Sequence, residues 1–268
     1  LALKWLKTKG LHLWTVKDLT LLLEADKITY TLGGTSSDRC METLVRSVLT
    51  VAGVATDTSI ACVTTGMAVS DVIGIELDTG EMHWTTVSAV TDAANVVITT
   101  QLPSGVAIGK VVYAYTTIAP KPLRIHEAYL IQKNGETSHT ILNVIPREEY
   151  QNKNNKSTSG VPNEIYFRPD TLFSELKIQP VSSDNVARIV MSAEYPFSDM
   201  TELTDNLSMP DWWHEPIYLW LSYLAAMGYN ATDEKVRMIK EAAMIAIFEA
   251  ENYDVENTYI QIDPEVTW

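Results

Sequence analysis

Residues 39–117 constrain the fold most, because Val, Thr, Ile and Ala dominate them and no helical periodicity lasts beyond two turns. Turn sequences such as Asp78-Thr-Gly80, Asp92-Ala-Ala-Asn95 and Pro103-Ser-Gly105 interrupt this stretch. The strands predicted between them are 44–51, 59–64, 72–77, 83–90, 96–99 and 111–116. Short strands at this spacing predict a small antiparallel barrel or sandwich, which we assign to an inserted β domain, residues 39–118.

The sequence on either side of this insert predicts a discontinuous helical and β core, residues 1–38 and 119–253. Residues 1–9 read as an amphipathic helix that Gly10 ends, and we expect further residues to precede Leu1. Residues 19–24 and 28–32 predict a short hairpin. Residues 123–132 and 140–144 predict a second hairpin around Asn134-Gly135. The remaining predicted strands are 164–168, 172–179 and 186–195.

Two helices are predicted after this sheet. Pro210 begins the first, which runs to about Tyr229, and Thr232 caps the second. In the second helix, Ala243 and Ile247 continue a buried stripe that Met244 and Phe248 widen. The residues expected in helical packing or in a ring interface are Trp212, Trp213, Ile217, Trp220, Val236 and Ile239.

Residues 254–268 have no helical period and mix acids and amides with large apolar groups. We expect an extended C-terminal arm that docks on a neighbouring subunit or a partner protein, including by strand addition to a sheet edge. Its predicted contact residues are Val255, Tyr259, Ile260, Ile262, Val266 and Trp268. The predicted fold class is therefore α+β: a helical bundle packed with a small antiparallel sheet, an inserted all-β barrel or sandwich, and this arm.

Charge and composition limit the possible partners. The chain has 34 acidic and 20 basic residues, a formal charge of −14. Phosphate binding needs clustered Lys and Arg, so we expect no broad nucleic-acid footprint. No apolar run approaches the roughly 20 residues of a membrane span. Cys40 and Cys62 are too few for a disulfide framework, and we expect both to be free, buried thiols.

A search for catalytic patterns finds none that requires an enzyme. The five histidines stand far apart, and the sequence has neither a Gly-x-Ser-x-Gly elbow nor a phosphate-binding glycine loop. Paired carboxylates, Asp211 with Glu215 or Glu148 with Glu149, could serve a glycosidase. Asp211 is explained equally by the first turn of a helix, where an acid is favourable. We therefore predict no catalytic residue, no metal and no cofactor.

Three segments carry a family resemblance. They are the opening Leu1-Ala-Leu-Lys-Trp-Leu-Lys-Thr-Lys-Gly-Leu-His-Leu-Trp14, the stretch Pro146-Arg-Glu-Glu-Tyr150 followed by Gly160-Val-Pro162 and Tyr166, and Met209-Pro-Asp-Trp-Trp213 at the start of the closing helical pair. In this order they resemble the head-to-tail adaptors of short-tailed bacteriophages, also called tail accessory or tail tubular proteins. The likeness covers residues 1–32 and 120–253, and the β insert departs from compact members of the family.

The resemblance implies a structural virion protein of the phage neck. Such adaptors form a homo-oligomeric ring, here expected to hold about twelve subunits, between the portal protein and the tail nozzle protein. The ring gives a channel in which DNA is only passing cargo during ejection. The expected location is the neck and tail of the virion, after synthesis in the host cytoplasm. Contact with tail fibre or collar proteins is the role considered for the β insert.

Two other functions remain open at the level of the sequence. One is a tail-associated cell-wall hydrolase, which would need two acids across a cleft. The other is a receptor- or carbohydrate-binding tail module that uses the β insert and Trp84.

Overall fold

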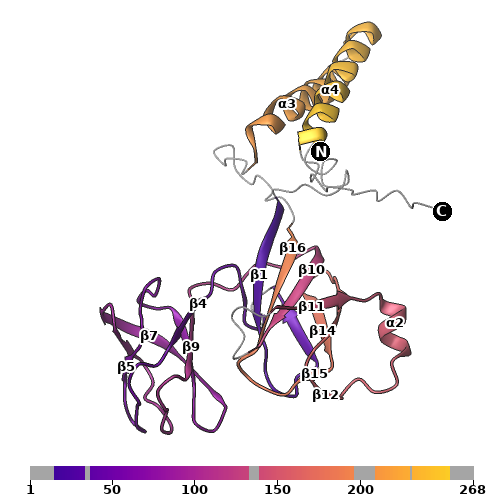
Figure 1. Ribbon diagram of the computed structural model, residues 1–268. Coiled ribbons are helices and arrows are strands. Elements are labelled where there is room, and N and C mark those ends of the chain that lie inside the picture. The colour runs from indigo at the N-terminus through magenta and orange to yellow at the C-terminus, as the bar shows by residue number, and fades with distance from the viewer. Residues whose placement is uncertain (1–14, 34–36, 133–138, 196–208, 230, 254–268) are drawn as a thin grey trace, which may run out of the picture. The chain divides into compact units, whose positions relative to one another are not determined.

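The computed structural model describes residues 15–33, 37–132, 139–195, 209–229 and 231–253. The chain divides into two compact units, residues 17–195 and the remainder at both ends. The first unit is a β structure with one short helix, and the described part of the second is a pair of helices (Figure 1).

An eight-stranded sheet organises the larger unit. Its order is β2-β14-β13-β11-β10-β16-β1-β3, with the parallel pair β11–β13 among antiparallel neighbours. Its strands are β1 (Val16–Leu22), β2 (Thr29–Leu32), β3 (Cys40–Met41), β10 (Arg124–Ile131), β11 (His139–Val144), β13 (Glu164–Arg168), β14 (Ser174–Gln179) and β16 (Arg188–Glu194). Alternating apolar residues give the sheet one inner face, where Leu19, Tyr30, Ile165 and Ile189 are fully buried. This core fixes the register of the strands.

A six-stranded sheet forms the second part of this unit, in the order β4-β9-β6-β7-β8-β5. Its strands are β4 (Val45–Val48), β5 (Ser59–Ala61), β6 (Val72–Glu76), β7 (Met82–Asp92), β8 (Asn95–Ile98) and β9 (Val111–Tyr115). A β-bridge between Leu49 and Cys62 joins the two outer strands, and the Thr50 N–H donates to Ala61 O over 2.9 Å. The sheet therefore curls onto itself as a small barrel, which removes the exposed edges that an open sheet would have.

The remaining elements of the larger unit are short. They are α2 (Arg147–Asn152), β12 (Ser159–Gly160) and β15 (Val181–Ser182). Strands β12 and β15 pair with each other in parallel. Tyr150 of α2 stacks on Tyr166 of β13 with ring centroids 5.1 Å apart, which anchors the helix to the sheet.

The smaller unit contains η2 (Asp211–Trp213), α3 (His214–Gly228) and α4 (Asp233–Tyr253). Helices α3 and α4 run antiparallel and side by side, joined by residues 229–232 (Figure 1). We call this pair, with η2, the helical hairpin. None of the helices in the described part of the chain is both long enough and apolar enough to cross a bilayer.

The predicted fold class, a helical bundle packed with a small antiparallel sheet, is wrong, because the described residues form mostly β structure. Strands outnumber helices throughout the described residues, and the sheet expected to be small and antiparallel has eight strands, one pair of them parallel. The predicted hairpin of 19–24 and 28–32 also fails, because β2 pairs with β14 while β1 lies between β16 and β3. Alternation of apolar residues predicts a strand, but it does not identify the strand's partner.

The predicted positions of the strands in residues 44–116 are confirmed. All six strands expected in residues 44–116 coincide with β4 to β9, and the expected hairpin around residue 134 is the antiparallel pair β10–β11. The division into a discontinuous core and an insert at 39–118 stays a prediction. The expected helix 1–9 and arm 254–268 lie outside the described residues.

Candidate functional site

The helical hairpin has a very small core of its own. Trp213 of η2 is fully buried, and it forms a cluster with Ala250 that Met209 and Ile217 extend. Ala243 and Ile247 are the other buried apolar residues of α4. Two helices that bury so few large side chains between them gain little hydrophobic stabilisation from their contact.

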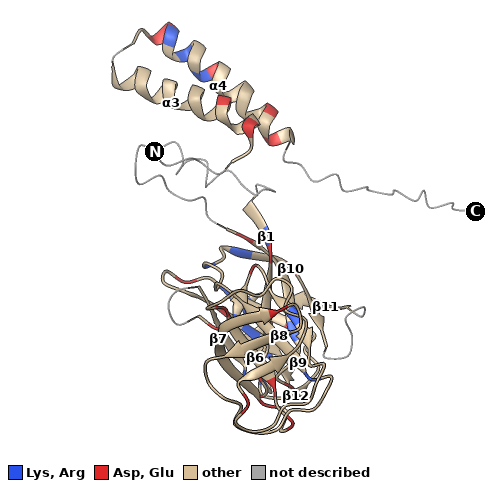
Figure 2. Cartoon of the chain, turned by 90° about the vertical axis from the view of Figure 1, so that its left-hand side faces the viewer, with Lys and Arg blue, Asp and Glu red and all other residues tan. Residues whose placement is uncertain are grey.

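Large apolar side chains instead cover the outside of the hairpin. Those of α3 and its ends are Trp212, Tyr218, Leu221, Met227 and Tyr229, and those of α4 are Met238, Met244, Ile245, Phe248 and Tyr253. Tyr218 is 70% exposed, and Phe248 is 65% exposed. Helix α3 carries a single charged side chain, Glu215, and Figure 2 shows the rest of it without Lys, Arg, Asp or Glu. Exposed apolar surface of this kind marks an interaction site.

Two predicted interface residues take part in packing within the hairpin. Trp213 is completely buried, and Ile217 packs against its cluster. Trp212 is 47% exposed and lies 6.2 Å from Tyr253 between ring centroids, so it bridges the beginning of η2 and the end of α4. Trp220, Val236 and Ile239 are half-buried. Their part in a ring interface stays a prediction, and the predicted arm contacts lie outside the described residues.

The sequence interpretation placed Met244 and Phe248 beside the buried stripe of α4, and this was wrong. They are 44% and 65% exposed, because the buried side of α4 runs through Ala243, Ile247 and Ala250. The missed signal is that apolar residues occur on several faces of α4, a pattern typical of a helix enclosed by more than one neighbour.

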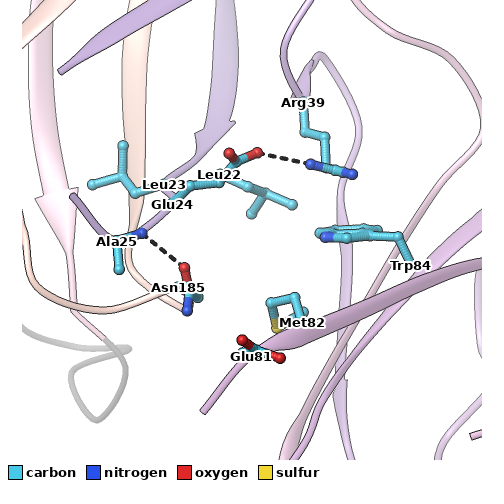
Figure 3. Close-up of a pocket in the computed structure, with 9 residues that line it drawn as sticks. All are labelled: Leu22, Leu23, Glu24, Ala25, Arg39, Glu81, Met82, Trp84 and Asn185. Carbon is cyan, nitrogen blue, oxygen red and sulfur yellow. Dashed lines mark hydrogen bonds and ion pairs between the residues drawn. The ribbon is translucent and has the colours of Figure 1, made fainter. Parts of the chain in front are cut away.

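A second candidate site is a pocket between the two parts of the β unit (Figure 3). Its volume is about 530 Å³. The residues that line it are Leu22, Leu23, Glu24, Ala25, Arg39, Glu81, Met82, Trp84 and Asn185. Arg39 donates to the Glu24 carboxylate over 2.8 Å, and the Ala25 N–H donates to Asn185 Oδ1 over 2.7 Å. These four residues of the pocket wall are therefore hydrogen-bonded in two pairs.

Trp84 belongs to the structural framework of this pocket. The Arg39 guanidinium lies 4.1 Å from the centroid of its ring, so one face of the indole is covered. On β6, Gly74 lies against the same ring, and a Cβ on Gly74 would come within 2.4 Å of Trp84. Trp84 therefore packs between the two parts of the unit and does not offer the open platform that a stacked sugar would need.

The local structure explains the burial or exposure of the other side chains that could take part in catalysis, the cysteines and the paired carboxylates. Cys40 and Cys62 are free and buried, as predicted, and burial raises the pKa of the Cys40 thiol to about 12. Glu148 and Glu149 lie in the first turn of α2, and Asp211 and Glu215 lie in the first turns of η2 and α3. None of these four carboxylates lines the pocket. The described residues include no cluster of His, Cys, Asp or Glu that could hold a metal ion.

Comparison with models of known protein families finds no match, and a search of curated protein sequences also finds none.

Proposed function

We propose that this chain is a structural subunit of a bacteriophage neck, a head-to-tail adaptor that forms a ring between the portal protein and the tail nozzle. The observation that carries the proposal is the apolar exterior of the helical hairpin. Ten large apolar or aromatic side chains on and beside α3 and α4 are more than a third exposed, and the hairpin buries few within itself. Association with neighbours would remove this surface from water.

In a ring, such a surface can be buried against neighbouring subunits, because each subunit presents two different faces to its two neighbours. Helix α4 is apolar on the side that faces α3 and again on the side of Met244 and Phe248. The larger unit does not depend on neighbouring subunits for its hydrophobic stabilisation, since its sheet and its barrel each have a buried core. The hairpin is therefore the part of the described chain assigned to assembly.

Charge supports the same proposal. The formal charge of −14 repels duplex DNA, so a channel built from such subunits lets the genome pass without retaining it. The same charge on every subunit opposes closure of a ring until enough surface is buried. We therefore expect assembly to need the portal as a template.

The test uses a double variant, Leu221→Glu with Phe248→Glu, which places a charge on each exposed helix face. Sedimentation with the portal protein of the same phage is the measurement. The variant is expected to keep its circular dichroism spectrum and to lose co-sedimentation with portal. The control is Ile141→Glu on β11, where the side chain is 81% exposed, and it should behave as the unchanged chain. If both variants co-sediment with portal equally well, the hairpin does not take part in assembly.

A further inference from the structure

The exposed side of α4 combines apolar and basic groups. Arg237, Lys240, Glu241, Met244 and Ile245 line a shallow groove along this helix. Met238 and Phe248 extend its apolar surface, since they are 62% and 65% exposed. We call these seven residues the α4 patch.

Two of the three basic residues in the described part of the hairpin, Arg237 and Lys240, belong to this patch. Within the described residues of the helical hairpin, the only Lys and Arg are Lys235, Arg237 and Lys240, all in the first half of α4 (Figure 2). The Arg237 Nε lies 3.7 Å from Glu241 Oε1, and the two side chains are 75% and 66% exposed. Such an exposed pair is weak, so the guanidinium can exchange this carboxylate for another. The patch therefore suits an acidic segment that also carries apolar side chains.

Residues 254–268 have this composition. Their charged side chains are all acidic: Asp254, Glu256, Asp263 and Glu265. Among these acids stand Val255, Tyr259, Ile260, Ile262, Val266 and Trp268. Opposite charge gives such a pair its specificity and orientation, while the apolar side chains give affinity.

The main sheet edges of the larger unit offer less to this segment. The barrel is joined at Leu49 and Cys62. On β2, the Thr31 N–H donates to the Asp38 carboxylate over 2.7 Å, and Thr31 O accepts from the Asp38 N–H over 2.8 Å. On β3, Cys40 O accepts from the Ala119 N–H over 2.8 Å. Strand addition at these positions would first have to displace existing hydrogen bonds.

We propose that residues 254–268 of one copy bind the α4 patch of the next copy. Joining a segment of one copy to a different surface of the next is a head-to-tail contact, which closes into a ring when repeated. This inference rests on the proposed ring, and it identifies the surfaces that link its subunits.

The test measures binding of a fluorescently labelled peptide of residues 254–268 to the full chain by anisotropy. Saturable binding is expected, weakened at least tenfold by Arg237→Glu with Lys240→Glu. The matched control reverses two exposed charges elsewhere, Arg124→Glu with Arg147→Glu, and should bind as the unchanged chain does. A peptide with Lys at all four acidic positions should show the opposite preference and bind the Arg237→Glu, Lys240→Glu chain better.

Two results would overturn the inference. One is no binding, or equal binding to the patch variant and the control. The other is binding only after residues 254–268 are removed from the chain, which would mean that each copy's segment occupies its own helix. The assay contains no portal, so its failure is distinct from a failure of the chain to join portal, which concerns the proposed function.

Discussion

The guanidinium of Arg39 lies 4.1 Å from the centroid of the Trp84 ring, and this contact joins the segment before β3 to strand β7 of the barrel. Arg39 also forms an ion pair with Glu24 over 2.8 Å, and the Asn185 Nδ2 donates to Gly80 O over 3.0 Å nearby. Tyr113 of β9 completes the junction, since its hydroxyl donates to Val186 O over 2.7 Å. The barrel and the eight-stranded sheet are thus held together by side chains from both.

The first prediction concerns the removal of the Arg39 side chain. Arg39→Ala should lower the free energy of unfolding by about 1 kcal/mol, because it loses a cation–π contact and a half-exposed ion pair. Urea denaturation followed by tryptophan fluorescence measures the change. Arg124→Ala, which removes an exposed arginine of β10, is the control and should change stability by less than about 0.5 kcal/mol. A loss no larger than the control's would show that Arg39 does not hold the junction.

A second prediction concerns the close approach of Gly74 to Trp84. Gly74→Ala should destabilise the chain by about 1–3 kcal/mol, because the new methyl would lie within 2.4 Å of the indole and force the ring to move. Thermal unfolding with near-ultraviolet circular dichroism reports both the loss and the displacement of the ring. Gly80→Ala has no such neighbour, but its φ of +86° adds backbone strain, so the spectrum separates the two. An unchanged tryptophan signal in Gly74→Ala would contradict the packing described.

The third prediction is a loss of stability at alkaline pH. Burial raises the pKa of Cys40 from an ordinary value of 9.0 to about 12, and it raises the pKa values of Tyr30 and Tyr195 as well. Above pH 9 the unfolded chain releases these protons first, so it binds fewer protons than the folded chain and stability falls as pH rises. Each group contributes up to about 1.4 kcal/mol per pH unit while only its unfolded form is ionised.

The urea midpoint measured between pH 7 and pH 10.5 tests this dependence. It should hold steady to about pH 8.5 and then decline, and Cys40→Ala should decline less steeply than the unchanged chain. A midpoint that stays constant to pH 10.5 would contradict the burial of these groups.

The sequence predicted the strands far better than their arrangement. Alternating apolar residues identified β4 to β9 and the β10–β11 pair, whose partners follow closely along the chain. The prediction that β1 and β2 pair with each other was wrong. Their partners, β16 and β14, lie more than a hundred residues away, and no local sequence pattern indicates them. An eight-stranded sheet assembled from such distant segments was therefore underestimated.

The candidate site was predicted only in part. Helical spacing assigned Trp213 and Ile217 to helical packing or to a ring interface. In the structure Trp213 is buried and Ile217 packs against its cluster, while a ring interface stays a prediction. Spacing could not show that Met244 and Phe248 face outward, because a helix with apolar residues on several faces does not reveal which face its first neighbour takes. The contact of Arg39 with Trp84 was also missed, since it joins a residue just before β3 to a residue of β7 that lies 45 positions further along the chain.

We propose that this chain joins a portal to build a ring, and a titration with portal tests this proposal most directly. Portal protein of the same phage is added in steps to the full chain while sedimentation velocity is recorded. We expect a slowly sedimenting, small species without portal and a single large complex with it, saturating near one copy for each portal subunit. Failure to co-sediment at any ratio would contradict the adaptor function.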